Sequence, residues 1–183
     1  MNQRYGIDYE ETFSPVIRNE SMRLLFALAA ELNLTIDHMD VVTAFLHGNL
    51  KEEVYMKQPE GFEIKGKEHY VCKLQKAMYG LKQASRAWYE KISEVLLNRL
   101  GFNRSEHEPC VFVRNKRSLM IIALYVDDLL IFSNDEAERK NVKKVLSSEF
   151  EMKDLGDVRK VIGVRIRKEN GMIKLDQKEY LGT

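Results

Sequence analysis

The sequence is poor in residues that would cross-link or stiffen a chain. It has 2 cysteines, 3 prolines and 4 histidines among 183 residues. Cys72 and Cys110 lack the close spacing of a metal or redox motif, and no export signal opens the chain, so we expect reduced thiols in the core. No two histidines have the spacing of a metal-binding pair, so we expect all four to be structural or exposed.

The sequence also has no long apolar run and almost no net charge. No stretch approaches the roughly 18 apolar residues that a membrane span requires, so we expect no membrane segment. Lys and Arg total 29 against 28 Asp and Glu, and the net charge of +1 does not indicate a nucleic-acid partner, although balanced totals can hide a basic groove. With 44% hydrophobic residues and no repeat or linker, the composition predicts one globular domain over 1–183.

The most informative stretch is 119–132, in which two apolar runs flank residues 125–128. Such runs predict two buried strands joined by a tight turn. Aspartate tolerates the positive φ of such turns, so Asp127 and Asp128 have a plain structural interpretation. They also place negative charge beside an apolar core, and something has to neutralise it. From alternation along the strand, we expect Asp127 to share a face with Tyr125, and Asp128 to point the other way or lie in the turn.

Periodic apolar patterns predict an α+β fold. Helices are indicated where apolar residues recur at helical spacing, and strands where they alternate or run continuously. The predicted helices have apolar faces over 24–32, behind Asn19 or Ser21 as N-cap, and over 88–100, preceded by Gly80 and Ser85 and ended by Gly101. A third is predicted over 135–150 behind Ser133 or Asn134. The predicted strands cover 34–41, 53–57, 70–74, 110–113, the hairpin 119–132, and the pair 161–167 and 172–175, which flanks a turn at Asn170-Gly171. A turn is predicted at 44–46, closed by Gly48.

The order strand, helix, hairpin, helix, strand is a ferredoxin-like βαββαβ plan, with an insertion at about 48–80. In this plan the first strand lies beside the hairpin, so Asp40 at its end can reach Asp127 or Asp128. Carboxylates about 4 Å apart repel by roughly 4 kcal/mol at an effective dielectric of about 20, so such a cluster binds protons or cations. Oxygen ligands suit Mg²⁺ or Mn²⁺, and two such ions about 3.5 to 4 Å apart serve in-line phosphoryl transfer. The residues therefore favour two-metal nucleotidyl transfer.

Five ordered blocks carry a further signal. They are residues 6–9 with 12–16, 39–46, 54–56 with 58–62, 77–88 and 124–131. Together they resemble the reverse transcriptase of copia-type long-terminal-repeat retrotransposons, over almost the whole chain. The Tyr-Val-Asp-Asp string of 125–128 alone would be a weak signal, but five blocks at compatible spacing are a strong one.

The resemblance implies a right-hand polymerase palm with a ferredoxin-like core and part of the fingers. The fingers-like insertion is implied at about 48–80. Asp40 and Asp127 would be the catalytic carboxylates that bind two Mg²⁺ or Mn²⁺ ions, with Asp128 as the adjacent, less central one. From the residue alone, Asp128 is equally well explained as an ordinary turn aspartate.

Other residues are implied to bind the substrates. Phe45 resembles the aromatic ring that excludes a 2′-hydroxyl group, although a core role is the commoner one for such a residue. Gln83 and Tyr125 resemble residues that line the nucleotide pocket, and a structural role for Gln83 is as good an account. The hairpin that grips the primer strand is implied at Ile162, Gly163 and Val164.

Basic residues around the insertion and the last hairpin are candidates for contacts with a phosphate backbone. Such contacts would make binding depend on salt, but solvated strand faces produce the same pattern. The residues are Lys73, Lys76, Lys82, Arg86, Arg165, Arg167 and Lys168.

The resemblance also implies substrates, partner domains and a location in the cell. The substrates would be an RNA or DNA template-primer and deoxynucleoside triphosphates. The chain would belong to a Gag-Pol-type polyprotein with integrase and ribonuclease H, in the cytoplasm within virus-like particles and without a membrane contact. Ser85 stands where the family usually has proline, and Val42 where lysine is common.

By this resemblance, we expect the N-terminal fingers strand, most of the thumb and ribonuclease H to be absent from 1–183. We therefore keep a second hypothesis, in which the chain is a truncated, inactive remnant or a host-retained fragment that binds nucleic acid. A palm-fold nucleotide cyclase is disfavoured, because no glycine-rich signature accompanies 125–128.

Overall fold

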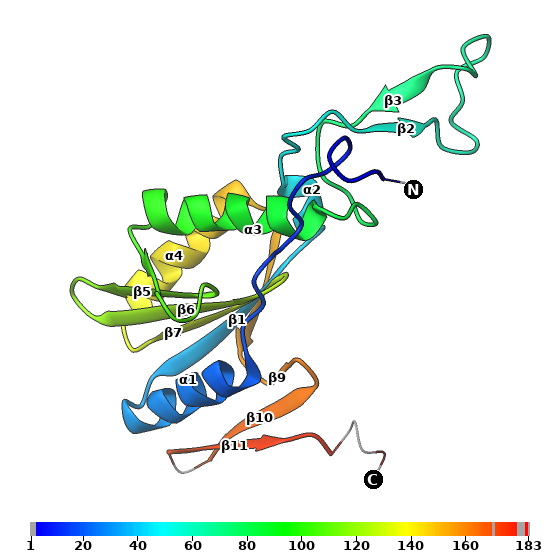
Figure 1. Cartoon of the computed structure of the whole chain (residues 1–183). Coiled ribbons are helices and arrows are strands. Elements are labelled where there is room, and N and C mark those ends of the chain that lie inside the picture. Colours follow the sequence, from blue (N-terminus) through cyan, green and yellow to red (C-terminus); the bar gives the residue numbers. More distant parts are fainter. Residues whose placement is uncertain (1–2, 170, 179–181, 183) are drawn as a thin grey trace. The chain divides into compact units, whose positions relative to one another are not determined.

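The computed structural model describes residues 3–169, 171–178 and 182. The chain divides into two compact units, a smaller one from Met1–Ser14 with Thr43–Ser93 and a larger one from Pro15–Val42 with Glu94–Thr183. The fold combines α-helices with antiparallel sheets, which confirms the predicted α+β class (Figure 1).

The larger unit is built on a six-stranded antiparallel sheet with the strand order β4-β5-β6-β7-β1-β8. Strand β1 pairs with β7 of the central hairpin, as the sequence predicts. The inner strands β6 and β7 are buried along nearly their whole length, as expected of continuous apolar runs. The bounds are β1 Thr35–Val41, β4 Asn103–Arg104, β5 Val111–Asn115, β6 Leu119–Tyr125, β7 Asp128–Ser133 and β8 Met152–Asp157.

In the predicted βαββαβ plan the last strand, 161–167, would pair with β1, but β8 occupies that edge. The sequence of β8 has no alternation to reveal it, since most of its residues are exposed and it is held by backbone pairing. Residues 161–167 instead turn at Ile162-Gly163, between β9 and β10. A separate three-stranded sheet results, with the order β11-β10-β9, from β9 Lys160–Val161, β10 Val164–Glu169 and β11 Met172–Asp176.

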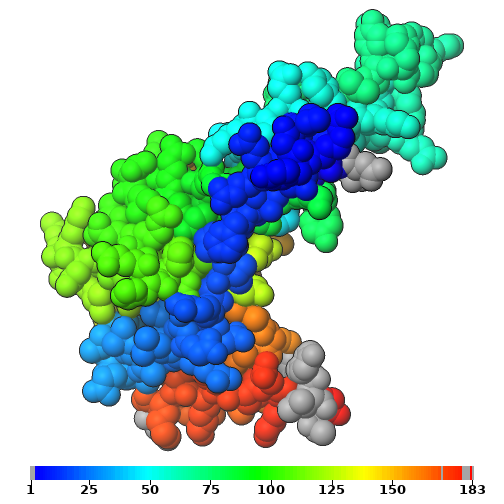
Figure 2. Space-filling view, in the orientation of Figure 1, coloured from blue at the N-terminus to red at the C-terminus, as the bar shows by residue number. Residues whose placement is uncertain are grey.

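Strands β10 and β11 pair as the sequence predicts, with Glu169 opposite Met172. Asn170 of the predicted turn lies outside the described residues, while Gly171 has a φ of 77°. Figure 2 shows these strands, in orange to red, beside the blue helix α1 (Asn19–Glu31).

Two helices cover opposite faces of the large sheet. The ring of Phe26 on α1 lies 6.1 Å from that of Phe132 on β7. On the other face, Arg139 of α4 (Glu136–Glu149) forms an ion pair with Asp37 of β1, with 3.2 Å between Nε and Oδ2. Because Phe132 lies opposite Ile36, the neighbour of Asp37, the two contacts fall on different faces.

The predicted N-caps of both helices are wrong. Among the described residues, no side chain of the α1 sequence caps its N-terminus, which follows Arg18. The carboxylate of Glu108 takes this role from a distant loop, accepting hydrogen bonds from Arg18 N at 3.3 Å and Ser21 Oγ at 2.8 Å. Helix α4 is capped by Asp135, whose Oδ1 accepts from the backbone N–H of Glu138 at 2.9 Å. Local sequence shows candidate caps but not the backbone angles that select among them.

The smaller unit contains a short helix α2 (Ala44–His47), the antiparallel pair β2 (Tyr55–Lys57) and β3 (Val71–Lys73), and most of α3 (Ala84–Glu94). The predicted pair of short strands is confirmed, whereas the turn predicted at 44–46 is a helix of one turn. Helix α3 begins at Ala84, one residue before Ser85, which was predicted to precede it, and continues as a π-helical turn, Val95–Arg99. A small apolar core joins these parts, made of Val54, Ala77, Leu81 and Ala84.

Both cysteines lie within the described residues and are free thiols. Cys110 is buried, and the loss of hydration raises the pKa of its thiol to about 12, whereas Cys72 is only half-buried. In the part of the chain that the structure describes, no helix is long and apolar enough to cross a membrane.

Candidate active site

Three neighbouring strands place Tyr125, Asp128 and Asp40 in one row. Tyr125 on β6 lies opposite Asp128 on β7, and Asp128 lies opposite Asp40 on β1. Residues that face each other in this way project from the same side of a sheet. The expected proximity of Asp40 to the hairpin is therefore confirmed. The expected faces are wrong, because it is Asp128 and not Asp127 that shares the face of Tyr125.

The hairpin turn consists of Val126 and Asp127, since Tyr125 and Asp128 form the last pair. The positive φ falls on Val126, at 55°, and not on an aspartate as predicted. A β-branched residue in this region is strained, and such strain persists only where the surroundings enforce it. The turn is tied to the next strand, because the carbonyl oxygen of Asp127 accepts a hydrogen bond from Val41 N at 3.0 Å.

The register brings carboxylates together. Because Val41 donates to Asp127, the next pair, Asp40 and Asp128, falls at a non-hydrogen-bonded position, where opposite Cα atoms are about 4.5 Å apart and side chains are closest. Like charges at such positions are destabilising. Loss of hydration raises the pKa of Asp127, and the charges of Asp128 and Asp40 raise it further, against a lowering hydrogen bond from its own backbone.

Asp128 has one close partner in this cluster. Nε2 of His38 lies 2.6 Å from Oδ1 of Asp128. His38 stands two residues before Asp40 on β1, and therefore on the same face of the sheet. The ring is buried, with 7% of the residue exposed, while Asp127 at the tip of the turn is exposed.

The residues fit a divalent cation by their chemistry and charge. Carboxylate oxygens are the ligands that Mg²⁺ and Mn²⁺ prefer, and mutual repulsion among Asp40, Asp127 and Asp128 is what a bound cation relieves. Within residues 3–169, 171–178 and 182, no three Asp, Glu, His or Cys side chains are arranged to hold a metal ion. The pairing of β1 with β7 therefore supplies the donors, but their side chains do not form a closed set of ligands.

Comparison with known proteins identifies the family. The family model described as reverse transcriptase (RNA-dependent DNA polymerase) matches residues 1–183. The chain belongs to the reverse transcriptase family. No solved structure gives a significant match to it.

The relatives are transposon polyproteins. The chain is 44% identical to the retrovirus-related Pol polyprotein from transposon TNT 1-94 of Nicotiana tabacum, over 98% of this chain and 14% of the relative. It is 42% identical to that from transposon RE2 of Arabidopsis thaliana, over 98% and 12%. It is 29% identical to the transposon Ty1-ER2 Gag-Pol polyprotein of Saccharomyces cerevisiae, over 92% and 10%. The predicted copia-type relationship is confirmed, and this reverse transcriptase sequence spans about a tenth to a seventh of these relatives.

Two residues predicted to bind the nucleotide lie in the smaller unit. Phe45, on α2, is half-buried, and its ring stacks on that of Tyr79 at 6.2 Å and 22°. Gln83 is buried, with 3% exposed, and its amide is engaged within the unit. Its Nε2 donates to the Asp8 carbonyl at 2.8 Å, and its Oε1 accepts from Gln3 at 2.8 Å. The roles predicted for Phe45 and Gln83 in reverse transcription stay predictions.

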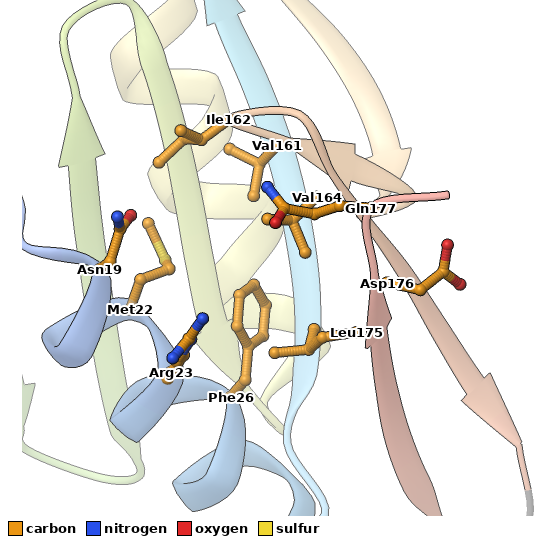
Figure 3. Close-up of a pocket in the computed structure, with 10 residues that line it drawn as sticks. All are labelled: Asn19, Met22, Arg23, Phe26, Val161, Ile162, Val164, Leu175, Asp176 and Gln177. Atoms are coloured by element: carbon orange, nitrogen blue, oxygen red, sulfur yellow. The ribbon is translucent and has the colours of Figure 1, made fainter. Parts of the chain in front are cut away.

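The residues predicted to grip the primer form a tight turn. Val161 lies opposite Val164, and the two residues between them, Ile162 and Gly163, have φ values of 51° and 70°. Ile162 and Val164 line a cavity of about 400 Å³ between α1 and the three-stranded sheet (Figure 3). The other lining residues are Asn19, Met22, Arg23, Phe26, Val161, Leu175, Asp176 and Gln177.

Most cations predicted to follow a phosphate backbone have partners within the protein. Arg165 and Arg167 both pair with Asp176, and Arg86 pairs with Glu11 and Glu90. The remaining contacts join Lys73 to Glu53, Lys76 to Asn49, Lys82 to the ring of Tyr9 and Lys168 to the Leu34 carbonyl. Only Lys73, Arg86, Arg165 and Arg167 have carboxylate partners in these contacts, so the charges of Lys76, Lys82 and Lys168 are not offset by them.

His38 is a site residue that was not predicted. No histidine has the spacing of a metal pair, so all four were expected to be structural or exposed. The signal that identifies His38 is its position two residues before Asp40 on a predicted strand, which places both side chains on one face. Its pairing with Asp128 follows only from the register of β1 with β7.

Proposed function

We propose that this chain is an RNA-directed DNA polymerase domain. It transfers nucleotides from deoxynucleoside triphosphates to the 3′-hydroxyl of a primer on an RNA or DNA template, in retrotransposon replication. The supporting observation is the row in which Asp40 faces Asp128, with Asp127 in the adjoining turn. Carboxylates concentrated at the end of a buried hairpin are costly unless cations bind, and nucleotidyl transfer uses such cations.

In this proposal Asp40 and Asp127 hold two Mg²⁺ or Mn²⁺ ions through their carboxylate oxygens, and Asp128 assists. The chemistry that such a pair of ions supplies is activation of the attacking oxygen and stabilisation of the leaving one. The bond from Val41 to the Asp127 carbonyl fixes the turn in advance, which limits reorganisation during the reaction. Tyr125 lies in the same row as Asp40 and Asp128, and borders the nucleotide.

The larger unit is proposed as the palm and the smaller as part of the fingers. The order β8-β1-β7-β6, with α3 and α4 in the connections, follows a ferredoxin-like βαββαβ plan with β8 as its fourth strand. We assign 1–183 to one fingers-and-palm domain, with 48–80 as the fingers-like insertion.

Three further assignments concern the substrates. The ring of Phe45 excludes a 2′-hydroxyl group and so favours deoxynucleotides. Gln83, whose buried amide bonds the Asp8 carbonyl, lines the nucleotide pocket. The turn of Ile162 and Gly163, with Val164, contacts the primer strand.

The proposed setting follows the relatives, which are Pol and Gag-Pol polyproteins. The chain acts within such a polyprotein, together with integrase and ribonuclease H, on a template-primer in cytoplasmic virus-like particles.

Primer extension tests the activity. The wild-type chain, Asp127→Asn and Asp157→Asn are compared on poly(rA)·oligo(dT) with dTTP and Mg²⁺ or Mn²⁺. Asp157 is an exposed aspartate at the end of β8, so its variant makes the same chemical change outside the row. Asp127→Asn is expected to lower incorporation by about 100-fold or more, because bound metal ions supply several kcal/mol of transition-state stabilisation. Asp157→Asn should retain wild-type incorporation.

Equal incorporation by the wild-type chain and Asp127→Asn would reject the proposed polymerase activity. Binding to the template-primer at two salt concentrations would then test whether the chain is a nucleic-acid-binding remnant. Binding through phosphates must weaken as the salt concentration rises.

A further inference from the structure

His38 and Asp128 form a contact that the proposed chemistry has not used. Asp128 has two carboxylate oxygens, and Oδ1 is the one that lies 2.6 Å from Nε2 of His38. An ionised carboxylate only accepts hydrogen bonds, so Nε2 is the donor in this contact when Asp128 is ionised. The bond therefore fixes one oxygen of Asp128 and leaves Oδ2 for other partners.

The position of His38 makes this bond directional. His38 lies opposite Leu130 on β7, two residues along from the pair of Asp40 and Asp128. The bond therefore runs diagonally between the strands, away from Asp40. A side chain held in this diagonal direction cannot at the same time turn Oδ1 toward Asp40.

The neighbouring strand is irregular at the same place. His38 is paired with Gly156 on β8 and Met39 with Asp154, so the register shifts between His38 and Met39. Such bulges commonly occur beside active sites, where they re-aim a side chain. The ring of His38 is buried beside this irregularity, with 7% of the residue exposed, so its rotamer is confined.

We propose that His38 is a positioning residue for the cation site. By holding Oδ1 of Asp128, it directs Oδ2 into the row with Asp40 and orients the carboxylate for the ions that Asp40 and Asp127 bind. The inference rests on the proposed function, because it requires a divalent cation at these carboxylates. Partners that orient a metal-binding carboxylate typically change metal affinity or activity by about 10- to 100-fold when they are removed.

Binding of Mn²⁺ to the chain without nucleic acid, followed by electron paramagnetic resonance, tests the proposal apart from activity. His38→Asn and His38→Gln form a matched pair of amides. The asparagine side chain is too short to reach Asp128, whereas the longer glutamine side chain keeps an N–H donor within reach of it. We expect a dissociation constant about tenfold higher for His38→Asn, and within about twofold of wild type for His38→Gln. His69→Asn, at an exposed position, should bind as wild type does.

A double-mutant cycle shows whether His38 acts through Asp128. In an Asp128→Asn background, His38→Asn should cause no further loss of Mn²⁺ affinity, whereas an independent structural effect would add to it. Primer extension adds a second readout, in which His38→Asn raises the Mn²⁺ concentration for half-maximal rate more than the KM for dTTP.

Several outcomes would overturn the proposal. They are equal Mn²⁺ affinity of His38→Asn and His38→Gln, additive losses in the cycle, or no Mn²⁺ binding by the wild-type chain. Wild-type Mn²⁺ binding that Asp127→Asn weakens, without any primer extension, would instead reject the proposed polymerase activity and leave the role of His38 measurable.

Discussion

Asp40 on β1 lies directly opposite Asp128 on β7, and the turn beside them carries the third carboxylate, Asp127. Like charges so placed oppose folding, and the pKa of Asp127 is raised first by lost hydration and then by the charges of Asp128 and Asp40. The proposed function therefore has a cost in stability that should be measurable when no cation is bound.

Asp40→Asn should stabilise the chain in EDTA by about 0.5 kcal/mol, the scale of charge pairs at partly exposed positions. Because the folded-state pKa of Asp127 is raised above 3.8, its ionisation lowers stability as the pH rises through that folded-state pKa, so the gain is present at neutral pH. Mg²⁺ should stabilise the wild-type chain more than the variant, because the ion binds the folded state. Urea unfolding with EDTA or Mg²⁺ measures both effects, and a less stable Asp40→Asn chain would contradict the prediction.

Val126→Asn should stabilise the fold by about 1 kcal/mol. Val126 has a φ of 55°, where a β-branched residue is strained and asparagine is tolerated. Val126→Ala is the matched control, because it shortens the side chain but keeps the Cβ atom that causes the strain. Thermal unfolding should give the highest melting temperature for Val126→Asn and lower values for Val126→Ala and the wild-type chain. Equal melting temperatures of all three chains would argue against stored strain in this turn.

Gly48→Ala should destabilise the smaller unit by about 1 to 3 kcal/mol, as overpacking does. The added Cβ would lie 2.9 Å from the carbonyl carbon and Cβ of Ala87 and from the backbone nitrogen of Trp88. The φ of Gly48 is −70°, so crowding and not backbone strain is the cause. Chemical unfolding should show a larger loss for Gly48→Val than for Gly48→Ala. A neutral Gly48→Ala change would mean that α2 does not approach α3 this closely.

Glu108→Gln should destabilise the chain by roughly 1 to 2 kcal/mol at neutral pH, the scale of hydrogen bonds to charged groups. Burial alone would raise the pKa of Glu108, but hydrogen bonds from Ser21 and Arg18 outweigh it and lower the pKa below 4.5. The stabilisation is therefore complete above pH about 4.5 and is lost as the pH falls through the lower folded-state pKa.

Urea unfolding at several pH values measures this effect. The difference between wild type and Glu108→Gln should shrink on acidification through that range. Glu106→Gln, at an exposed position two residues away, should stay close to wild type at every pH. A difference that does not change with pH would show that the charge of Glu108 contributes nothing to the cap of α1.

Periodicity predicted the elements that bury an apolar face, and it failed where burial is slight. The hairpin of β6 and β7 and the helix α4 appear within a residue or two of their predicted bounds, because their apolar residues recur regularly. Strand β8 has no periodic signal in the sequence, since its residues are mostly exposed and it is held by backbone pairing with β1 and by the contact of Asp154 with Lys143. The sequence likewise gave no signal that Glu108 caps α1, because it reaches Ser21 from a distant part of the chain.

The sequence by itself determined the family and the buried hairpin, and it showed that Asp40 could reach Asp127 or Asp128 in the predicted strand order. Apolar runs and ordered motifs are local properties, so they can be recognised without coordinates. Only the tertiary structure decided that Asp128, and not Asp127, faces Asp40, and that His38 holds it. A shift of one residue in the pairing of β1 with β7 would turn each side chain to the opposite face, and this register is set by strands far apart in the chain.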